Sequence, residues 1–396
     1  MTIMKQIYCN SRWRWTMLIA LAGMWLAGCR KTDYPVVNSP AYLRVFNCLT
    51  YNVTIETKDA PQPFLTMLVD PKLNENGAPV DAAITCDFLD TRGPLARPYP
   101  DAGNTALWQK EFPGTAKVAV GPIVNGYDLS SYAQVASGKH RFMFMTRPRS
   151  NDPFYSLNDG LRKNVLVDTT INLTEGEVYT MNVLELSAYT RKTGVYLRQE
   201  QFTKMPFSDS MVYVNFYNLS SEGFYATYPY DPNNGPFNIA IHDSMGVYYS
   251  LFRDEGYYGA VIQGYVHNFM TTVIRSQTPE VHPYFSFPLF PEPQGSHIFA
   301  GNAGQVFYFA LPGTPPERVE QGTNSDNHGT FTSASVGPVH PTTVFGLGGD
   351  VRTGLAVTIH SGIYNPRSFA TINTIEYING NMYLTMLQRR YDPPTY

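Results

Sequence analysis

Charge is scarce in this 396-residue chain. Asp, Glu, Lys and Arg together make up 15% of the residues, the formal net charge is −3, and no cluster of Lys and Arg occurs in the body of the chain. A nucleic-acid site needs a concentrated basic patch to neutralise phosphates. The composition therefore argues against nucleic acid as a partner.

Motifs of catalytic and metal sites are also missing. The eight histidines form no pair at helical spacing and no cluster with zinc spacing. There is no Gly-x-Ser-x-Gly elbow and no Gly-x-x-x-x-Gly-Lys loop. Loops 70–77, 231–235 and 324–329 are rich in oxygen donors but lack the spacing of a calcium hand, so we interpret them as turns. The sequence thus predicts no enzyme, no metal and no cofactor.

No apolar run is long enough to cross a bilayer. The N-terminal run, residues 15–26, is uncharged and about a dozen residues long, whereas a spanning helix needs about 20. Lys5, Arg12 and Arg14 precede it. This arrangement is typical of an export signal, so residues 1–28 are predicted to be removed from the mature protein.

The signal ends in Leu26-Ala27-Gly28-Cys29, which resembles the lipobox of bacterial lipoproteins. The resemblance implies a diacylglyceryl thioether on the Cys29 sulfur, cleavage before Cys29, and acylation of the new amino terminus by a fatty acid such as palmitate. Each buried methylene contributes about 0.8 kcal/mol, so several acyl chains make a lasting anchor. The alternative is an ordinary secretory signal with a chance cysteine.

Only two cysteines remain for the folded part. Cys9 is lost with the signal and Cys29 takes lipid, which leaves Cys48 and Cys86 in an oxidising compartment where a disulfide can form. Cys48 also ends an apolar strand-like run, which suits a buried thiol. The sequence is compatible with both alternatives, a Cys48–Cys86 disulfide or two buried thiols.

Turn formers and aromatic residues are plentiful. The chain has 30 Pro, 31 Gly and 14% aromatic residues, and we find no amphipathic helical stripe longer than about three turns. Short alternating segments such as 41–47 and 165–173 are separated by turn clusters, which predicts a mainly β chain of β-sandwiches. Asn379-Gly380 predicts a hairpin between strands at 369–378 and 382–387.

The strand pattern restarts in the second half. Residues 211–219 resemble 41–48, and residues 304–311 resemble 176–183, in the same order. Two matched segments in one order predict two copies of one β domain. The expected organisation is a signal peptide at 1–28, a polar tether at 29–40, and two tandem immunoglobulin-like β-sandwich domains at 41–201 and 210–396.

The lipobox, the tether, the opening strand Ala-Tyr-Leu-Arg-Val-Phe-Asn and later Gly-x-x-Tyr strands resemble one family. They are similar to Bacteroidetes envelope lipoproteins that carry tandem immunoglobulin-like domains of unknown function (the DUF4397 type). The segments that carry the resemblance are 41–47, 137–145, 175–183 and 211–219. The resemblance implies a β-sandwich fold and an envelope location, and it offers no established chemistry.

The residue after the lipidated cysteine bears on the membrane. Arg30 stands where an Asp would resemble an inner-membrane retention signal, which favours the outer membrane. Lipoproteins exported to the Bacteroidetes cell surface resemble one another in acidic residues after the cysteine, whereas here Arg30, Lys31 and Thr32 precede Asp33. This departure argues against surface exposure without excluding it. We expect a lipid anchor in the outer membrane, with the cell surface somewhat favoured over the periplasmic face.

Tyrosines crowd one part of the second half. Aromatic faces stack on sugars and anchor protein interfaces, although packing within the sandwich would use the same residues. The candidate binding surface comprises Tyr225, Tyr228, Tyr230, Tyr248, Tyr249, Tyr257 and Tyr258.

These observations predict a non-catalytic outer-membrane lipoprotein that binds a protein partner. It would be held by Cys29 and act as an accessory subunit of a complex for nutrient import or protein assembly. One alternative is a glycan-binding surface lipoprotein. Another is a glycoside or other hydrolase, because the 32 Asp and Glu residues offer carboxylate pairs.

Overall fold

The computed structural model describes thirteen stretches of the chain, all of them after residue 36. These are 37–49, 64–88, 99, 108–109, 116–148, 152–208, 211–224, 243–252, 261–288, 304–319, 330–336, 369–378 and 381–390. The chain divides into two compact units, Met1–Val36 and Val37–Tyr396. The predicted signal and Cys29 therefore lie outside the described residues.

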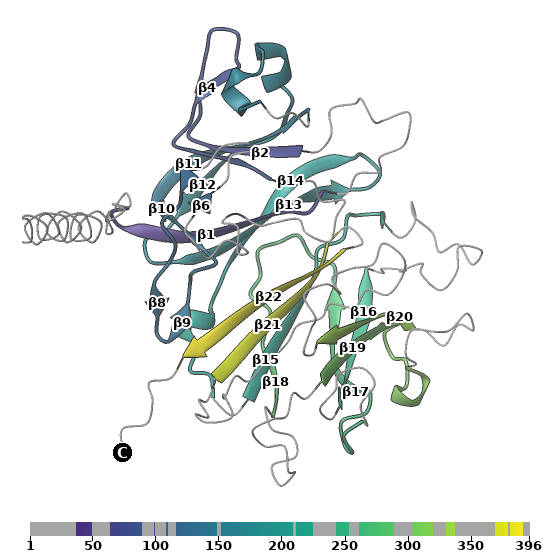
Figure 1. Cartoon of the computed structure of the whole chain (residues 1–396). Helices are drawn as coiled ribbons and strands as arrows, with labels where there is room; N and C mark the ends of the chain where they lie inside the picture. The colour runs from purple at the N-terminus through teal and green to yellow at the C-terminus, as the bar shows by residue number, and fades with distance from the viewer. Residues whose placement is uncertain are drawn as a thin grey trace, which may run out of the picture. The chain divides into compact units, whose positions relative to one another are not determined.

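The described chain is mainly β, as predicted (Figure 1). No helix within these stretches combines the length and the apolar character that crossing a membrane would require. Short 3-10 helices occur at η1 (Phe154–Ser156), η2 (Asp159–Arg162), η3 (Phe202–Lys204) and η6 (Pro316–Arg318). Two small two-stranded ribbons pair β3 (Lys72–Leu73) with β4 (Pro79–Asp81) and β6 (Trp108–Gln109) with β7 (Ala116–Lys117).

The first half of the chain forms two four-stranded sheets. Sheet 1a has the order β10 (Ala133–Ala136), β1 (Pro40–Asn47), β13 (Val178–Ser187), β14 (Lys192–Gln199). Sheet 1b has the order β12 (Val165–Leu173), β11 (Gly138–Arg147), β2 (Phe64–Val69), β5 (Ile84–Asp87). Alternate side chains of both sheets meet in one core, which includes Leu43, Met181, Met67 and Phe144.

The second half forms another pair of sheets (Figure 1). Sheet 2a has the order β18 (Phe285–Pro288), β15 (Met211–Asn218), β21 (Phe369–Ile378), β22 (Asn381–Arg390), β9 (Tyr127–Asp128), β8 (Ile123–Val124). Sheet 2b has the order β17 (Asn268–Ile274), β16 (Ser244–Phe252), β19 (Gly304–Ala310), β20 (Thr330–Val336). Val214, Phe216, Val247 and Phe307 belong to the second core.

Within the described residues, the two halves share one arrangement of eight main strands in two sheets. In each, the first strand pairs in parallel with the seventh, as β1 with β13 and β15 with β21, and the remaining strands take the same places in chain order. The match of 211–219 with 41–48 therefore holds.

The second sequence match is wrong. Residues 304–311 include β19, whose place in sheet 2b is that of β11 in sheet 1b, whereas the counterpart of β13 is β21. Both β11 and β13 are central strands with apolar and aromatic alternation that follow a glycine turn. Local pattern alone does not distinguish them.

One hairpin crosses the predicted boundary between the halves. Strands β8 and β9 lie in residues 123–128 of the first half, yet β9 pairs with β22 through Tyr127 and Arg389. Asn125 and Gly126 turn the chain with φ values of 50° and 83°, which suits a two-residue hairpin loop. The first half thus extends a sheet that the second half builds.

The predicted C-terminal hairpin is confirmed in its strands. β21 and β22 pair antiparallel from Phe369 with Arg390 to Ile378 with Asn381. The turn residues Asn379 and Gly380 lie outside the described residues.

A buried asparagine interrupts the second core. Asn373 is 0% exposed, and neither polar atom of its side chain has a hydrogen-bond partner among the described residues. It lies on the same face of β21 as the core residue Ile375. By register its counterpart in the first half is Tyr179, whose hydroxyl accepts from the Thr174 amide at 3.1 Å. The second core thus has an unsatisfied amide where the first has a bonded tyrosine.

Replacing Asn373 with valine should stabilise the protein. An unsatisfied buried polar group costs about 1–3 kcal/mol, and valine suits a strand, so Asn373→Val should raise the free energy of unfolding by about that amount. Calorimetric unfolding would measure it. Asn218→Val is the matched control, because the side-chain Oδ1 of Asn218 accepts from the Ser220 amide and hydroxyl and the change should destabilise. A loss of stability in both variants would contradict the reasoning.

Candidate functional site: a polar stripe between the two halves

Sheets 1a and 2a are buried on both faces. Nearly every residue of β1, β13 and β15 is buried, including those that point away from the cores. Strand residues alternate between faces. A strand that is buried throughout must therefore be covered on its second face as well.

The second faces of the two sheets pack against each other at two apolar clusters. One cluster includes Tyr42 and Val178 of sheet 1a with Ile372 and Leu387 of sheet 2a. The other includes Phe46, Leu184 and Tyr196 of sheet 1a with Tyr217 and Ile378 of sheet 2a. Fully burying a large apolar side chain contributes roughly 1.5–3 kcal/mol, so these clusters supply an apolar driving force for joining the halves.

Polar side chains fill the space between the clusters. On sheet 1a a cross-strand row runs through Arg44, Thr180 and Arg198, and on sheet 2a a row runs through Asn215, Thr374 and Thr385. We call these six, with their neighbours Asn182, Glu200 and Glu376, the polar stripe. All nine are buried.

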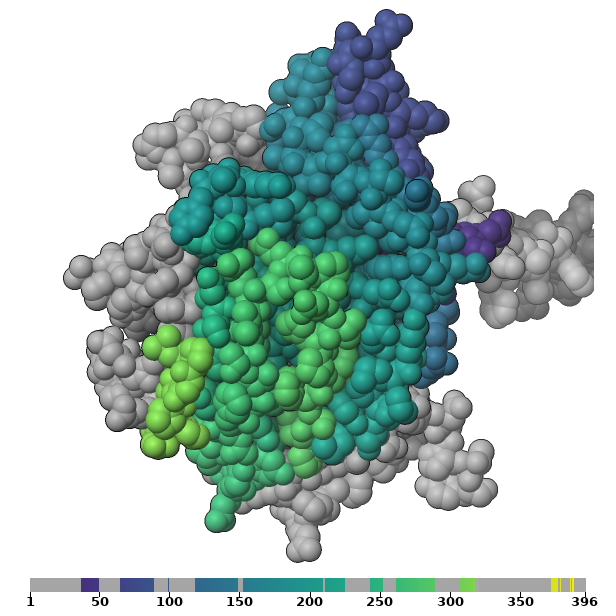
Figure 2. Space-filling model, turned by 180° about the vertical axis from the view of Figure 1, so that it is seen from behind, coloured from purple at the N-terminus to yellow at the C-terminus, as the bar shows by residue number. Residues whose placement is uncertain are grey.

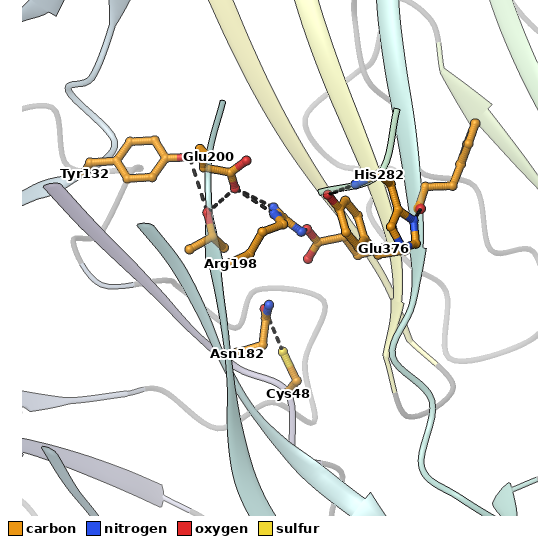
Figure 3. Close-up of polar contacts among 10 residues, drawn as sticks. Cys48, Tyr132, Asn182, Arg198, Glu200, His282 and Glu376 are labelled. Carbon is orange, nitrogen blue, oxygen red and sulfur yellow. Dashed lines mark hydrogen bonds and ion pairs between the residues drawn. The ribbon is translucent and has the colours of Figure 1, made fainter. Parts of the chain in front are cut away.

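Arg198 is the centre of the polar stripe (Figure 3). Its Nε and Nη2 atoms donate to Glu200 Oε1 at 2.9 and 2.6 Å, and its Nη1 donates to Glu376 Oε1. The guanidinium carbon lies 4.4 Å from the ring centroid of Tyr217. One cation of the first half thus binds a carboxylate that directly follows its own strand and a carboxylate of the second half.

Neutral hydroxyl groups extend the contact. Thr180 Oγ1 donates to Glu200 Oε1 at 2.6 Å and lies 3.4 Å from the hydroxyl of Tyr132 (Figure 3). Burial raises the pKa of the Tyr132 phenol, and the charge of Glu200 adds to that rise. Tyr132 therefore stays a neutral hydrogen-bonding group.

The charges of the stripe balance. Burial lowers the pKa of Arg44, against the attraction of Tyr132, Glu376 and Glu200. Burial would also lower the pKa of Arg198, but Glu200 and Glu376 hold it well above the usual value. Two guanidinium groups therefore face two carboxyl groups, and burial raises the pKa of Glu376 despite the opposing charge of Arg198.

This geometry does not suit hydrolysis. Glu200 and Glu376 are 4% and 0% exposed, and both bind the same guanidinium. Glycoside hydrolysis needs two carboxyl groups that flank an accessible substrate. The carboxylates that the structure brings together here are used in joining the halves.

The two remaining cysteines are buried thiols and not a disulfide. Cys48 lies in the apolar cluster with Phe46 and donates to Asn182 Oδ1 at 3.6 Å (Figure 3). Cys86 lies in the first core beside Met67. Because they occupy separate clusters, the disulfide alternative is wrong for this structure.

Two of the candidate tyrosines are packed. Tyr248 is buried, its hydroxyl donates to the Thr314 carbonyl, and its ring lies edge-on to Phe269 at 5.4 Å. Tyr249, on the opposite face of β16, stacks on Phe287 in the second core at 5.4 Å. The packing alternative is therefore the one observed for this pair. Tyr225, Tyr228, Tyr230, Tyr257 and Tyr258 lie outside the described residues.

The first oxygen-rich loop is a turn. Asn74 Oδ1 accepts from the backbone amides of Asn76 and Ala78 at 3.0 and 2.9 Å. Within the described stretches, no group of three or more His, Cys, Asp or Glu residues is placed to hold a metal ion. Loops 231–235 and 324–329 lie outside the described residues.

The polar stripe was not predicted from the sequence. Arg44 and Arg198 occupy strand positions that alternate with core residues, and such positions ordinarily face water. One signal was available: Ala41, Tyr42 and Leu43 are adjacent apolar residues, as are Val45 and Phe46, so apolar residues occur on both faces of β1. Apolar residues on both faces of a strand are typical of a sheet that is covered on both sides.

Comparisons with known proteins add little. No protein-family model matches the chain, and no curated protein matches it. Among solved structures the chain is similar to one described as a putative cell adhesion protein from Bacteroides uniformis, with 8% identity over 90% of this chain and 100% of that one, at a TM-score of 0.15. A likeness this weak carries no argument, so the resemblance to Bacteroidetes lipoproteins stays a prediction.

Removing Arg198 should destabilise the protein strongly. Arg198→Leu leaves Glu200 and Glu376 buried without their shared donor, and breaking a buried ion pair in this way costs about 3–5 kcal/mol. Arg141→Leu is the control, because Arg141 pairs with Asp168 at the surface, where such pairs contribute about 0–1 kcal/mol. Scanning calorimetry compares the two variants, and equal losses would contradict a central role for Arg198.

Glu376→Gln should change how stability depends on pH. Because burial raises the pKa of Glu376, the folded state holds this proton more tightly than the unfolded chain does. The stabilisation is complete below the unfolded pKa, about 4.3, and is lost as the pH rises through the higher folded pKa. Glutamine mimics the neutral form, so the variant should gain stability relative to wild type as the pH rises.

Denaturant unfolding at a series of pH values measures this difference. Asp168→Asn gives a control of opposite sign, because hydrogen bonding to Arg141 lowers the pKa of Asp168, so that variant should lose stability relative to wild type as the pH rises. A difference between wild type and Glu376→Gln that is independent of pH would show that the Glu376 pKa is not raised.

Proposed function

We propose that the protein is a non-catalytic outer-membrane lipoprotein, anchored through Cys29, that acts as an interaction subunit of a membrane complex. The complex would serve nutrient import or protein assembly. The sequence of the lipobox supports the anchor. The use of Glu200, Glu376 and Arg198 in joining the two halves supports a binding role over a catalytic one.

Exposed apolar side chains on sheet 2b carry the proposal of a protein partner. Phe269 and Ile274 of β17 are 55% and 62% exposed, and Leu311 after β19 is 44% exposed. Phe269 lies opposite Tyr248 and Ile274 opposite Ser244, so both stand on the face of sheet 2b that points away from the core.

Both segments are visible on one face of the molecule. Residues 261–288 (green) and 311–317 (lime green) appear together in Figure 2. Protein interaction sites expose apolar side chains on one face, and Phe269 and Ile274 are the basis on which we assign this face to the partner.

Isolation of the tagged protein from its native membrane in mild detergent tests the proposal. We expect a stoichiometric protein partner with wild type and loss of that partner with Phe269→Ser combined with Ile274→Thr. Val165→Thr is the matched control, because Val165 is 42% exposed on the first half and its change should leave the partner bound.

The anchor is tested in the same preparation. Cys29→Ser should leave the membrane fraction and lose incorporation of labelled palmitate. Recovery of wild type as a monomer without a partner would reject the proposed complex, and membrane retention of Cys29→Ser would reject the anchor.

Glycan binding by a lipoprotein remains the second candidate, and no specific observation favours it. Its candidate residues within the described chain, Tyr248 and Tyr249, are packed against Phe269 and Phe287. Failure of polysaccharides to retard the protein in a gel would remove it.

A further inference from the structure

Five polar atoms of the polar stripe have no hydrogen-bond partner among the described residues. Sheet 1a contributes Arg44 Nε and Asn182 Nδ2, and sheet 2a contributes Asn215 Oδ1, Glu376 Oε2 and Thr385 Oγ1. All five side chains are at least nine-tenths buried. They come from the facing surfaces of two different sheets, so they concentrate where the two halves meet.

These five buried polar atoms need hydrogen-bond partners. Buried polar groups in folded proteins nearly always have one, either in the protein or in ordered water, because an unpaired group loses its hydration without compensation. The side chains that flank these atoms are already engaged: Asn182 Oδ1 accepts from Cys48, and Glu376 Oε1 accepts from Arg198. The five atoms therefore call for a ligand that enters between the sheets.

The chemistry of the five atoms selects the ligand. Sheet 1a offers N–H donors, sheet 2a offers carbonyl and carboxylate acceptors, and the Thr385 hydroxyl can act as either. A cation would be repelled by Arg44 and Arg198, and an anion by Glu200 and Glu376. A neutral molecule that both donates and accepts fits this set, and water is the smallest one.

We propose that the polar stripe is a binding site for ordered internal water that bridges the two halves. Ordered water accepts from Arg44 Nε or Asn182 Nδ2 of sheet 1a and donates to Asn215 Oδ1, Glu376 Oε2 or Thr385 Oγ1 of sheet 2a, and each molecule makes at most four hydrogen bonds. The halves are then joined by a hydrated contact beside the direct pair of Arg198 with Glu376.

Two measurements on the mature chain test this site. A crystal structure that resolves water should show at least one molecule within hydrogen-bond distance of a donor of sheet 1a and an acceptor of sheet 2a. Oxygen-17 magnetic relaxation dispersion, which detects long-lived internal water in solution, should lose the contribution of at least one molecule in Asn215→Leu and in Thr385→Val.

Thr66→Val serves as the control variant. Thr66 is as deeply buried, but its hydroxyl donates directly to Asp87, so its loss should leave the relaxation amplitude unchanged. The proposal is overturned if the crystal shows the five atoms paired directly with one another, or if the stripe variants keep the wild-type amplitude. If a variant does not fold, the wild-type crystal structure still decides.

Discussion

The contact of Arg198 with Glu200 and Glu376 requires that sheets 1a and 2a pack against each other. The face of each sheet that points away from its core is then removed from water. Sheets 1a and 2a already fill a core on one face each. Covering the other face leaves every charged side chain there without solvent. Since an isolated buried charge is very costly, the surface that joins the halves must carry equal numbers of opposite charges, as Arg44, Arg198, Glu200 and Glu376 do. The apolar clusters at either end provide the driving force, and the ion pairs restrict the alignment to one in which Arg198 reaches Glu376.

The duplicated topology makes this complementarity harder to reach. Each half places its first, seventh and eighth strands side by side, so the two outer faces have equivalent rows. If the rows were identical in sequence, Arg44 and Arg198 would face two more arginines. Instead the equivalent row of sheet 2a holds Asn215, Thr374 and Thr385. The equivalent rows have diverged, with two arginines on sheet 1a and neutral polar residues on sheet 2a, which is a hypothesis for how two copies of one fold associate in a single register.

The alternation of apolar residues predicted the strands but not which surfaces cover them. The alternation of residues 41–47 predicted β1, observed at Pro40–Asn47, and the Asn379-Gly380 pair predicted the final hairpin. Period-two alternation assigns side chains to two faces, but it does not say whether the second face meets water or another sheet. For this reason alternation alone does not show that Arg198 is buried between two sheets. The pairing of β9 with β22 could not be predicted from the sequence either, because it joins residues more than 250 positions apart through a single register pair.

Proximity in sequence was a poor guide to a shared surface for the tyrosines. Tyr248 and Tyr249 are adjacent in β16, so a strand sends them to opposite faces, and one of the two must enter the core. The same alternation of side chains between the two faces of a strand identifies a more exposed apolar surface than that of these two tyrosines. Phe269 and Ile274 point to one face because the register shift between Val247 and Tyr248 adds a residue between them. That bulge brings two apolar side chains at odd spacing onto one face of the sheet, so the surface available to a partner depends on an irregularity that alternation alone does not reveal.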